Sequence, residues 1–120
     1  LMPVHAHFDA TATGSVETMA VAPSLIHNLV AWHTNATDAF LQLFDAAAAS
    51  SVTLGTTTPD LVIPLVAGDG TLIGAAAIDI GPGGLLFTKG VQYAVTTTAV
   101  NATSPSAAAM LSAIVQPHGS

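Results

Sequence analysis

Apolar and polar residues alternate over short stretches of this chain, and no long stretch shows the 3.6-residue spacing of an amphipathic helix. Valine, isoleucine and threonine are frequent in these stretches, and proline or glycine interrupts the chain at short intervals. Such a pattern is typical of many short strands in a sandwich or barrel. We therefore predict an all-β fold of about eight short strands in an antiparallel β-sandwich.

The expected strands follow one another with turns between them. A proline in the fifth of them, Pro64, predicts an edge or bulged strand, because proline cannot donate a ladder hydrogen bond. An alanine run over residues 45–51 could form a helical turn. The segment 85–87 is a further short apolar piece. The eight strands are expected at residues 4–8, 15–21, 25–34, 39–44, 60–66, 72–80, 91–97 and 108–115.

Alternation also predicts which side chains share a face. In the third strand, Ile26, Val30 and Trp32 fall on one side of a regular strand, and Leu25, Leu29 and the two histidines fall on the other. In the fourth strand, both faces are apolar, which predicts that a neighbour covers each of them. Its alternating positions are Phe40, Gln42 and Phe44 on one face, and Leu41 and Leu43 on the other.

Length and charge limit the possible functions. The chain has 120 residues, which fits a single domain. It carries one Lys or Arg and seven Asp or Glu, so its net charge is −6, and it has no cysteine. One cation cannot neutralise a row of phosphates or anchor a protein to anionic lipid. We therefore expect neither a nucleic acid nor a membrane as a partner.

Charged residues are unusually sparse for a small domain. They make up 7% of the chain, and the mean hydropathy is +0.64. Freely soluble small domains have surfaces that are roughly 25–35% charged. This composition favours a subunit that packs against copies of itself or against a larger partner.

From Trp32 onward the chain resembles a group of small virion proteins of tailed bacteriophages. The resemblance lies in ordered motifs that together cover about two-thirds of the chain, and it departs from the group at Val66, where proline is common. The motifs are WHTNAT at 32–37, FLQLFD at 40–45, TLGTTTP at 53–59, LVIPL at 61–65 and GLLFTKGVQYAVT at 84–96.

The resemblance implies a small antiparallel β-sandwich, jelly-roll-like, that is a structural component of the virion. It implies a capsid decoration (cement) protein on the capsid exterior, bound between subunits of the major capsid protein. We expect a homo-oligomer, with a trimer favoured. The alternative is a tail or fibre module that binds host glycan through Trp32 or Tyr93, although core packing is the favoured role of these rings.

The N-terminal segment lies outside the resemblance. We expect residues 1–12 to form an arm or an edge strand, and residues 13–120 to form the single sandwich domain. An arm of this kind would contact a neighbouring subunit. Its expected interface residues are Val4, His5, His7 and Phe8.

The sequence contains no strong pattern for a catalytic, metal-binding or phosphate-binding site. His5 and His7 share one face of a strand and could chelate a metal with a third ligand, but no partner ligand can be assigned. The aspartates sit near predicted turns, and the GPGG at 81–84 lacks the residues of a phosphate loop. We expect no catalytic, cofactor-binding or metal-binding residues, and no enzyme.

Overall fold

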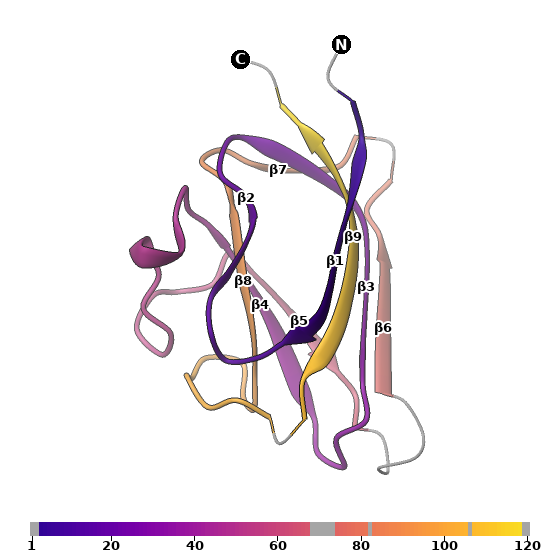
Figure 1. Cartoon of the computed structure of the whole chain (residues 1–120), viewed down its shortest axis with the longest axis vertical. Coiled ribbons are helices and arrows are strands. Elements are labelled where there is room, and N and C mark those ends of the chain that lie inside the picture. The colour runs from indigo at the N-terminus through magenta and orange to yellow at the C-terminus, as the bar shows by residue number, and fades with distance from the viewer. Residues whose placement is uncertain (1–2, 68–73, 82, 106, 119–120) are drawn as a thin grey trace.

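The computed structural model describes residues 3–67, 74–81, 83–105 and 107–118, which form two antiparallel sheets packed face to face (Figure 1). The first sheet has the order β1-β9-β3-β6, with β7 also paired to β3, and the second has the order β2-β8-β4-β5. One turn of 3-10 helix, η1, spans Ala49–Ser51. The strands are β1 His5–Ala12, β2 Glu17–Ala20, β3 Ser24–His33, β4 Ala39–Asp45, β5 Leu61–Leu65, β6 Gly74–Asp79, β7 Leu85–Phe87, β8 Val91–Thr96 and β9 Ala109–Pro117.

Strands β6 and β7 occupy successive parts of one edge. β6 pairs with residues 28–33 of β3, and β7 pairs with residues 24–26 of the same strand. The interruption between them contains Gly81 and Gly84, whose φ angles of 93° and 71° favour glycine. If β6 and β7 are counted as one strand, each of the two sheets has four strands. The chain then passes from one sheet to the other in the strand order of a jelly roll. The predicted antiparallel, jelly-roll-like sandwich is confirmed.

The main core lies between the two sheets. It is built from the inward-facing positions of the strands, which alternate with outward-facing ones as the strand period of two requires. Leu41 and Leu43 of β4 face Leu111 and Val115 of the first sheet across this layer, and all four are buried.

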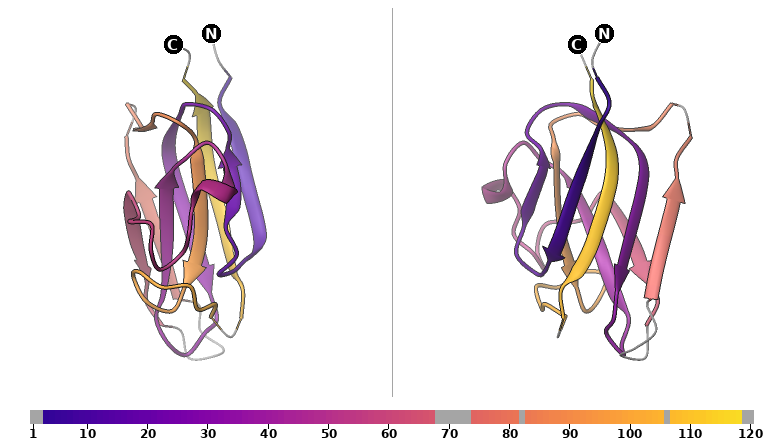
Figure 2. Two further views of the ribbon diagram at one scale, coloured as in Figure 1. Left: turned by 90° about the vertical axis from the view of Figure 1, so that its left-hand side faces the viewer. Right: turned by 45° about the vertical axis from the view of Figure 1, so that its right-hand side comes forward.

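The outer face of the second sheet is covered by the chain itself. Residues 46–57 cross it, as the left panel of Figure 2 shows, and form a second apolar cluster over Phe44. Beside this cluster, the Gln92 side chain donates to the Ala46 carbonyl at 3.0 Å. Both faces of β4 are therefore buried, as the sequence predicts. The cluster consists of Phe44, Ala46 and Val52, with Val16 and Leu54 packed against it.

The faces of β3 differ from the sequence prediction. A register shift between Ile26 and Asn28 reverses the alternation, so that Ile26 faces the core whereas Val30 and Trp32 lie on the outer face. The prediction that these three residues share one side is wrong, and so is the prediction that Trp32 packs in the core. One extra residue in the strand is the physical cause, because every later side chain then points to the opposite face.

Other local predictions are confirmed. The strand that contains Pro64 is β5, which lies at the edge of the second sheet with Pro64 exposed. The alanine run ends in the single helical turn η1. Among the described residues, no helix is long and apolar enough to cross a membrane.

Candidate functional site

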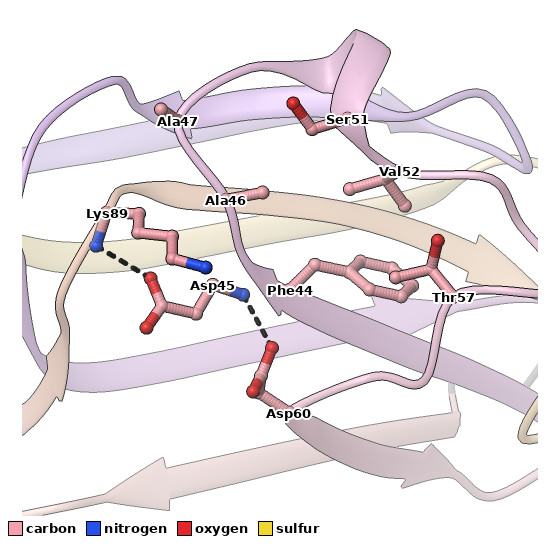
Figure 3. A pocket seen from close by; sticks show the side chains of 9 residues that line it. All are labelled: Phe44, Asp45, Ala46, Ala47, Ser51, Val52, Thr57, Asp60 and Lys89. Atoms are coloured by element: carbon pink, nitrogen blue, oxygen red, sulfur yellow. Dashed lines mark hydrogen bonds between the residues drawn. The ribbon is translucent and has the colours of Figure 1, made fainter.

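A surface pocket of about 320 Å³ opens beside the end of β4 (Figure 3). Two carboxylates that line the pocket, those of Asp45 and Asp60, accept hydrogen bonds from backbone N–H groups. Asp60 accepts from the Asp45 N–H at 2.7 Å, and Asp45 accepts from the N–H groups of Thr88 and Lys89 at 2.9 and 2.8 Å. Burial acts to raise the pKa of Asp45, but these bonds and one from the Thr88 hydroxyl outweigh it and lower the pKa. The geometry fixes the turn before β8.

A second polar cluster joins the two sheets at their β1 and β2 side. The Tyr93 hydroxyl, on β8, donates to Asp9 Oδ2 at 2.7 Å, and its oxygen lies 2.9 Å from His7 Nε2. Because the phenol proton goes to Asp9, the His7 Nε2–H is the donor in the second bond. His7 and Tyr93 also meet edge to face, with ring centroids 5.6 Å apart. The cluster attaches the edge strand β1 to the opposite sheet.

The partly buried position of this cluster changes its proton affinities. Burial, together with the adjacent Asp9 carboxylate, raises the pKa of Tyr93 well above its usual range. Burial lowers the pKa of His7, and Asp9 opposes this shift only in part. The cluster is therefore most stable with a protonated phenol and a neutral imidazole.

His27 and His33 lie apart from this cluster. His33 is buried and its Nε2 donates to the Val66 carbonyl at 2.9 Å, while its Nδ1 accepts from the Asn35 backbone. His27 contacts the Gln116 side chain at 2.9 Å. The bulge in β3 separates these two histidines, which the sequence predicts on one face. In the part of the chain that the structure describes, no group of three or more His, Cys, Asp or Glu could hold a metal ion.

Exposed apolar side chains gather on the outer face of the first sheet. No loop crosses in front of β1, β9 and β3 in the right panel of Figure 2. Phe8 stacks on Trp32, with ring centroids 6.5 Å apart and an interplanar angle of 29°. Phe8 is 60% exposed. Cross-strand partners place the following apolar side chains on this face: Phe8, Val30, Trp32, Leu86, Met110 and Ile114.

The polar positions of this outer face include no Asp, Glu, Lys or Arg on β1, β9, β3 and β7 as the structure describes them. They are Asn28, Ser112 and Gln116, and the His27 ring lies 2.9 Å from the Gln116 side chain. A carboxylate appears only at its margin, where Asp79 of β6 stands opposite Asn28 and accepts from the Gly81 N–H. A surface without ions can be buried without the cost of desolvating a charge.

The predicted interface residues divide between two environments. Phe8 lies on the outer face of the first sheet, and Val4 is exposed just before β1. His5 and His7 share the inner face of β1, opposite to that of Phe8: His5 is exposed at the start of the strand, whereas His7 contacts Tyr93. Sequence reasoning missed the roles of Asp9 and Asn35, which hold their segments to residues more than 70 positions away. Only the strand pairing could have indicated those contacts.

No protein-family model matches the chain, and no curated protein matches it. One similar solved structure is the cryo-EM structure of the virus-like particle of extra small virus from the giant freshwater prawn Macrobrachium rosenbergii. The two chains share 18% identity with a TM-score of 0.44, over 96% of this chain and 77% of the other. The fold assignment accordingly rests on the strand pairing described above.

Proposed function

We propose that this chain is a structural protein of a virus particle, and more specifically a capsid decoration protein of a tailed bacteriophage. In this role it binds on the capsid exterior between subunits of the major capsid protein. The order of the sequence motifs from Trp32 to Thr96 supports the phage assignment. Burial of uncharged surface against the shell is the mechanism.

The distribution of exposed apolar side chains carries this proposal. Val21, Val66 and Val100 are 70%, 66% and 51% exposed, and they lie in three separate loops or strand ends. A protein that contacts several neighbours at once needs apolar surface on more than one side. Many weak contacts, repeated over symmetric copies of a shell, then resist its disassembly together.

The free edge of β1 offers a second means of attachment. β1 pairs with β9 on one side only and is the end strand of its sheet in the described residues. Its unpaired backbone groups can accept an extended segment of a neighbouring subunit as an additional strand.

Purified particles test the proposal. We expect the chain in virions of a phage that encodes it, at a fixed ratio to the major capsid protein. We also expect cryo-EM density for it on the capsid exterior. Particles made without the chain should bind the purified protein saturably and should then release their DNA at a higher temperature. Recovery of the chain from lysate but never from virions would refute the proposal, and density on the tail would refute the decoration role.

One observation favours a second candidate, a tail or fibre module that binds host glycan. Stacked Phe8 and Trp32 could support a sugar ring, although the buried Tyr93 cannot. This candidate predicts glycan-array binding that Trp32→Ala abolishes. A chain without glycan binding would eliminate it.

A further inference from the structure

The two sheets differ in what covers their outer faces. Residues 46–57 cover the second sheet over Phe44, whereas β1, β9 and β3 of the first sheet are left bare. We propose that the outer face of the first sheet packs against the same face of a second copy of this chain, across a two-fold axis. The inference adds a contact surface to the homo-oligomer expected from the sequence, and it does not depend on the capsid-binding role.

The size of this face suits a contact between two copies. Three strands about 4.8 Å apart, each about 30 Å long at most, project an area of roughly 430 Å². Side-chain relief raises the accessible area above that value, although each partner in a standard interface buries roughly 800 Å². A face of this size suits a weak, reversible pair.

The placement of charge identifies a second copy as the partner. Each copy carries a net charge of −6, so two copies repel one another unless their carboxylates stay apart. Asp45 and Asp60 lie beside the pocket of the second sheet, and Glu17 of β2 stands opposite the core-facing Tyr93. When the bare faces meet, these groups lie behind the first sheet of each copy, and Asp79 stands at the margin of the contact. A basic partner would instead prefer the acidic second sheet.

The shape of the surface favours pairs over larger rings. The Cα positions extend over 43 × 28 × 18 Å, and the view down the shortest axis shows both sheets edge on, so the outer face of the first sheet is long and narrow (Figure 1). A second copy of the same length can cover such a face, and a two-fold axis makes that contact self-complementary. The geometry thus points to a dimer, whereas a trimer is the oligomer expected from the sequence.

Sedimentation velocity over a concentration series tests the proposal with two matched variants. Val30 is 39% exposed on the outer face, and Thr56 is exposed in the segment that covers the second sheet. Val30→Asp places two carboxylates in the contact and should raise the dimer dissociation constant at least tenfold, while Thr56→Asp adds the same charge away from the contact and should change it little. Both variants should keep the circular dichroism spectrum of the parent, because each side chain is exposed in the single copy.

A second measurement does not depend on destabilising the contact. The chain has no cysteine, so Ser112→Cys supplies a unique attachment point near the centre of the face, and Ser50→Cys supplies one on η1 beyond the other sheet. Spin labels at position 112 should lie closer together in the dimer than labels at position 50.

The outcomes separate the possibilities. A protein that stays monomeric at every concentration would overturn the proposal. So would a trimer, a Val30→Asp variant that associates like its parent, or labels closer at position 50 than at 112. Glycan binding by a monomer would assign the face to sugar instead. A dimer that never appears in virions would support this contact and refute only the capsid role.

Discussion

Three side chains decide how the edge strand β1 is attached to the rest of the molecule. The Tyr93 hydroxyl bridges His7 and Asp9, and its ring is 1% exposed. These are hydrogen bonds between the two sheets, so their loss affects the closure of the sandwich and not the strand pairing within either sheet. A bridge of this type links the protonation of single groups to the stability of the whole fold.

Removing the Tyr93 hydroxyl should destabilise the fold. Tyr93→Phe keeps the ring but leaves His7 Nε2 and Asp9 Oδ2 without their partner, at a cost of about 1–3 kcal/mol in the free energy of unfolding. Urea unfolding measures this change. Thr56→Val, at an exposed loop position, is the control and should stay within about 0.5 kcal/mol of the parent.

The same substitution should change the alkaline pH dependence. Because the pKa of Tyr93 is raised in the folded state, its contribution to stability is complete below the ordinary value of 10.0 and is lost as the pH rises above it. We expect the parent to lose stability in this range more steeply than Tyr93→Phe. Parallel unfolding curves for the two proteins at high pH would contradict the bridge.

His7 should control part of the acid response. Its pKa is lowered from 6.5, chiefly by burial, with Asp9 and Glu17 acting to raise it and His5 to lower it. The stability that neutral His7 contributes is therefore complete above 6.5 and is lost as the pH falls through the lowered pKa. His7→Gln keeps an N–H donor without a titrating ring, so its urea midpoint should fall less than that of the parent between about pH 7.5 and about pH 5. Equal decreases would show that other groups carry the acid response.

At the scale of elements, the turn into β8 lies against the backbone of two other segments. A Cβ atom on Gly90 would lie 2.6 Å from the Ala46 carbonyl oxygen and 2.7 Å from that of Ala20. Both are backbone atoms, one in the segment that covers the second sheet and one at the end of β2, so neither can move without disturbing its element.

Gly90→Ala should therefore destabilise the fold by about 1–3 kcal/mol, because either the covering segment or β2 must shift. Gly83→Ala is the matched control, since nothing lies within 4 Å of its Cβ position. Thermal unfolding of both variants checks the expectation. Equal melting temperatures of the two variants would mean that the backbone around Gly90 can shift without a loss of stability.

Much of this element structure could be predicted from the sequence. Pro64 indicated an edge strand, and the two apolar faces of β4 indicated cover on both sides, since both signals depend on local chemistry. The faces of β3 could not be predicted, because no residue in Ser24–His33 marks the bulge that turns Trp32 outward. The contact of His7 with Tyr93 joins residues 86 positions apart, and it depends on which strands face each other across the core.

At the scale of the whole molecule, charge is divided unevenly between the outer faces of the two sheets. The outer face of the first sheet carries no Asp, Glu, Lys or Arg on its described strands β1, β9, β3 and β7, whereas Asp45 and Asp60 line the pocket beside the second sheet. Repulsion between copies should therefore be a long-range effect that salt and pH can change, while the contact itself is apolar.

Self-association should accordingly strengthen as salt rises at neutral pH, because screening reduces the repulsion between copies of net charge −6. It should also strengthen as the pH falls toward the isoelectric point near 4.8, where that charge vanishes. Sedimentation equilibrium at several salt concentrations measures both trends, with Val30→Asp as the control that should stay dissociated. Weaker association at high salt would indicate an ionic contact instead.

The start of β1 and the end of β9 lie side by side, with His5 opposite Val115 at one pole of the molecule (Figure 1). A short peptide linker could therefore join residues 3 and 118 without altering any strand pairing. The circle could then be reopened in an exposed loop, such as the one between β8 and β9, to give a circular permutant with the same sandwich. The order in which the chain connects the strands can therefore be changed at this end of the molecule while the strand pairing of the sandwich is kept.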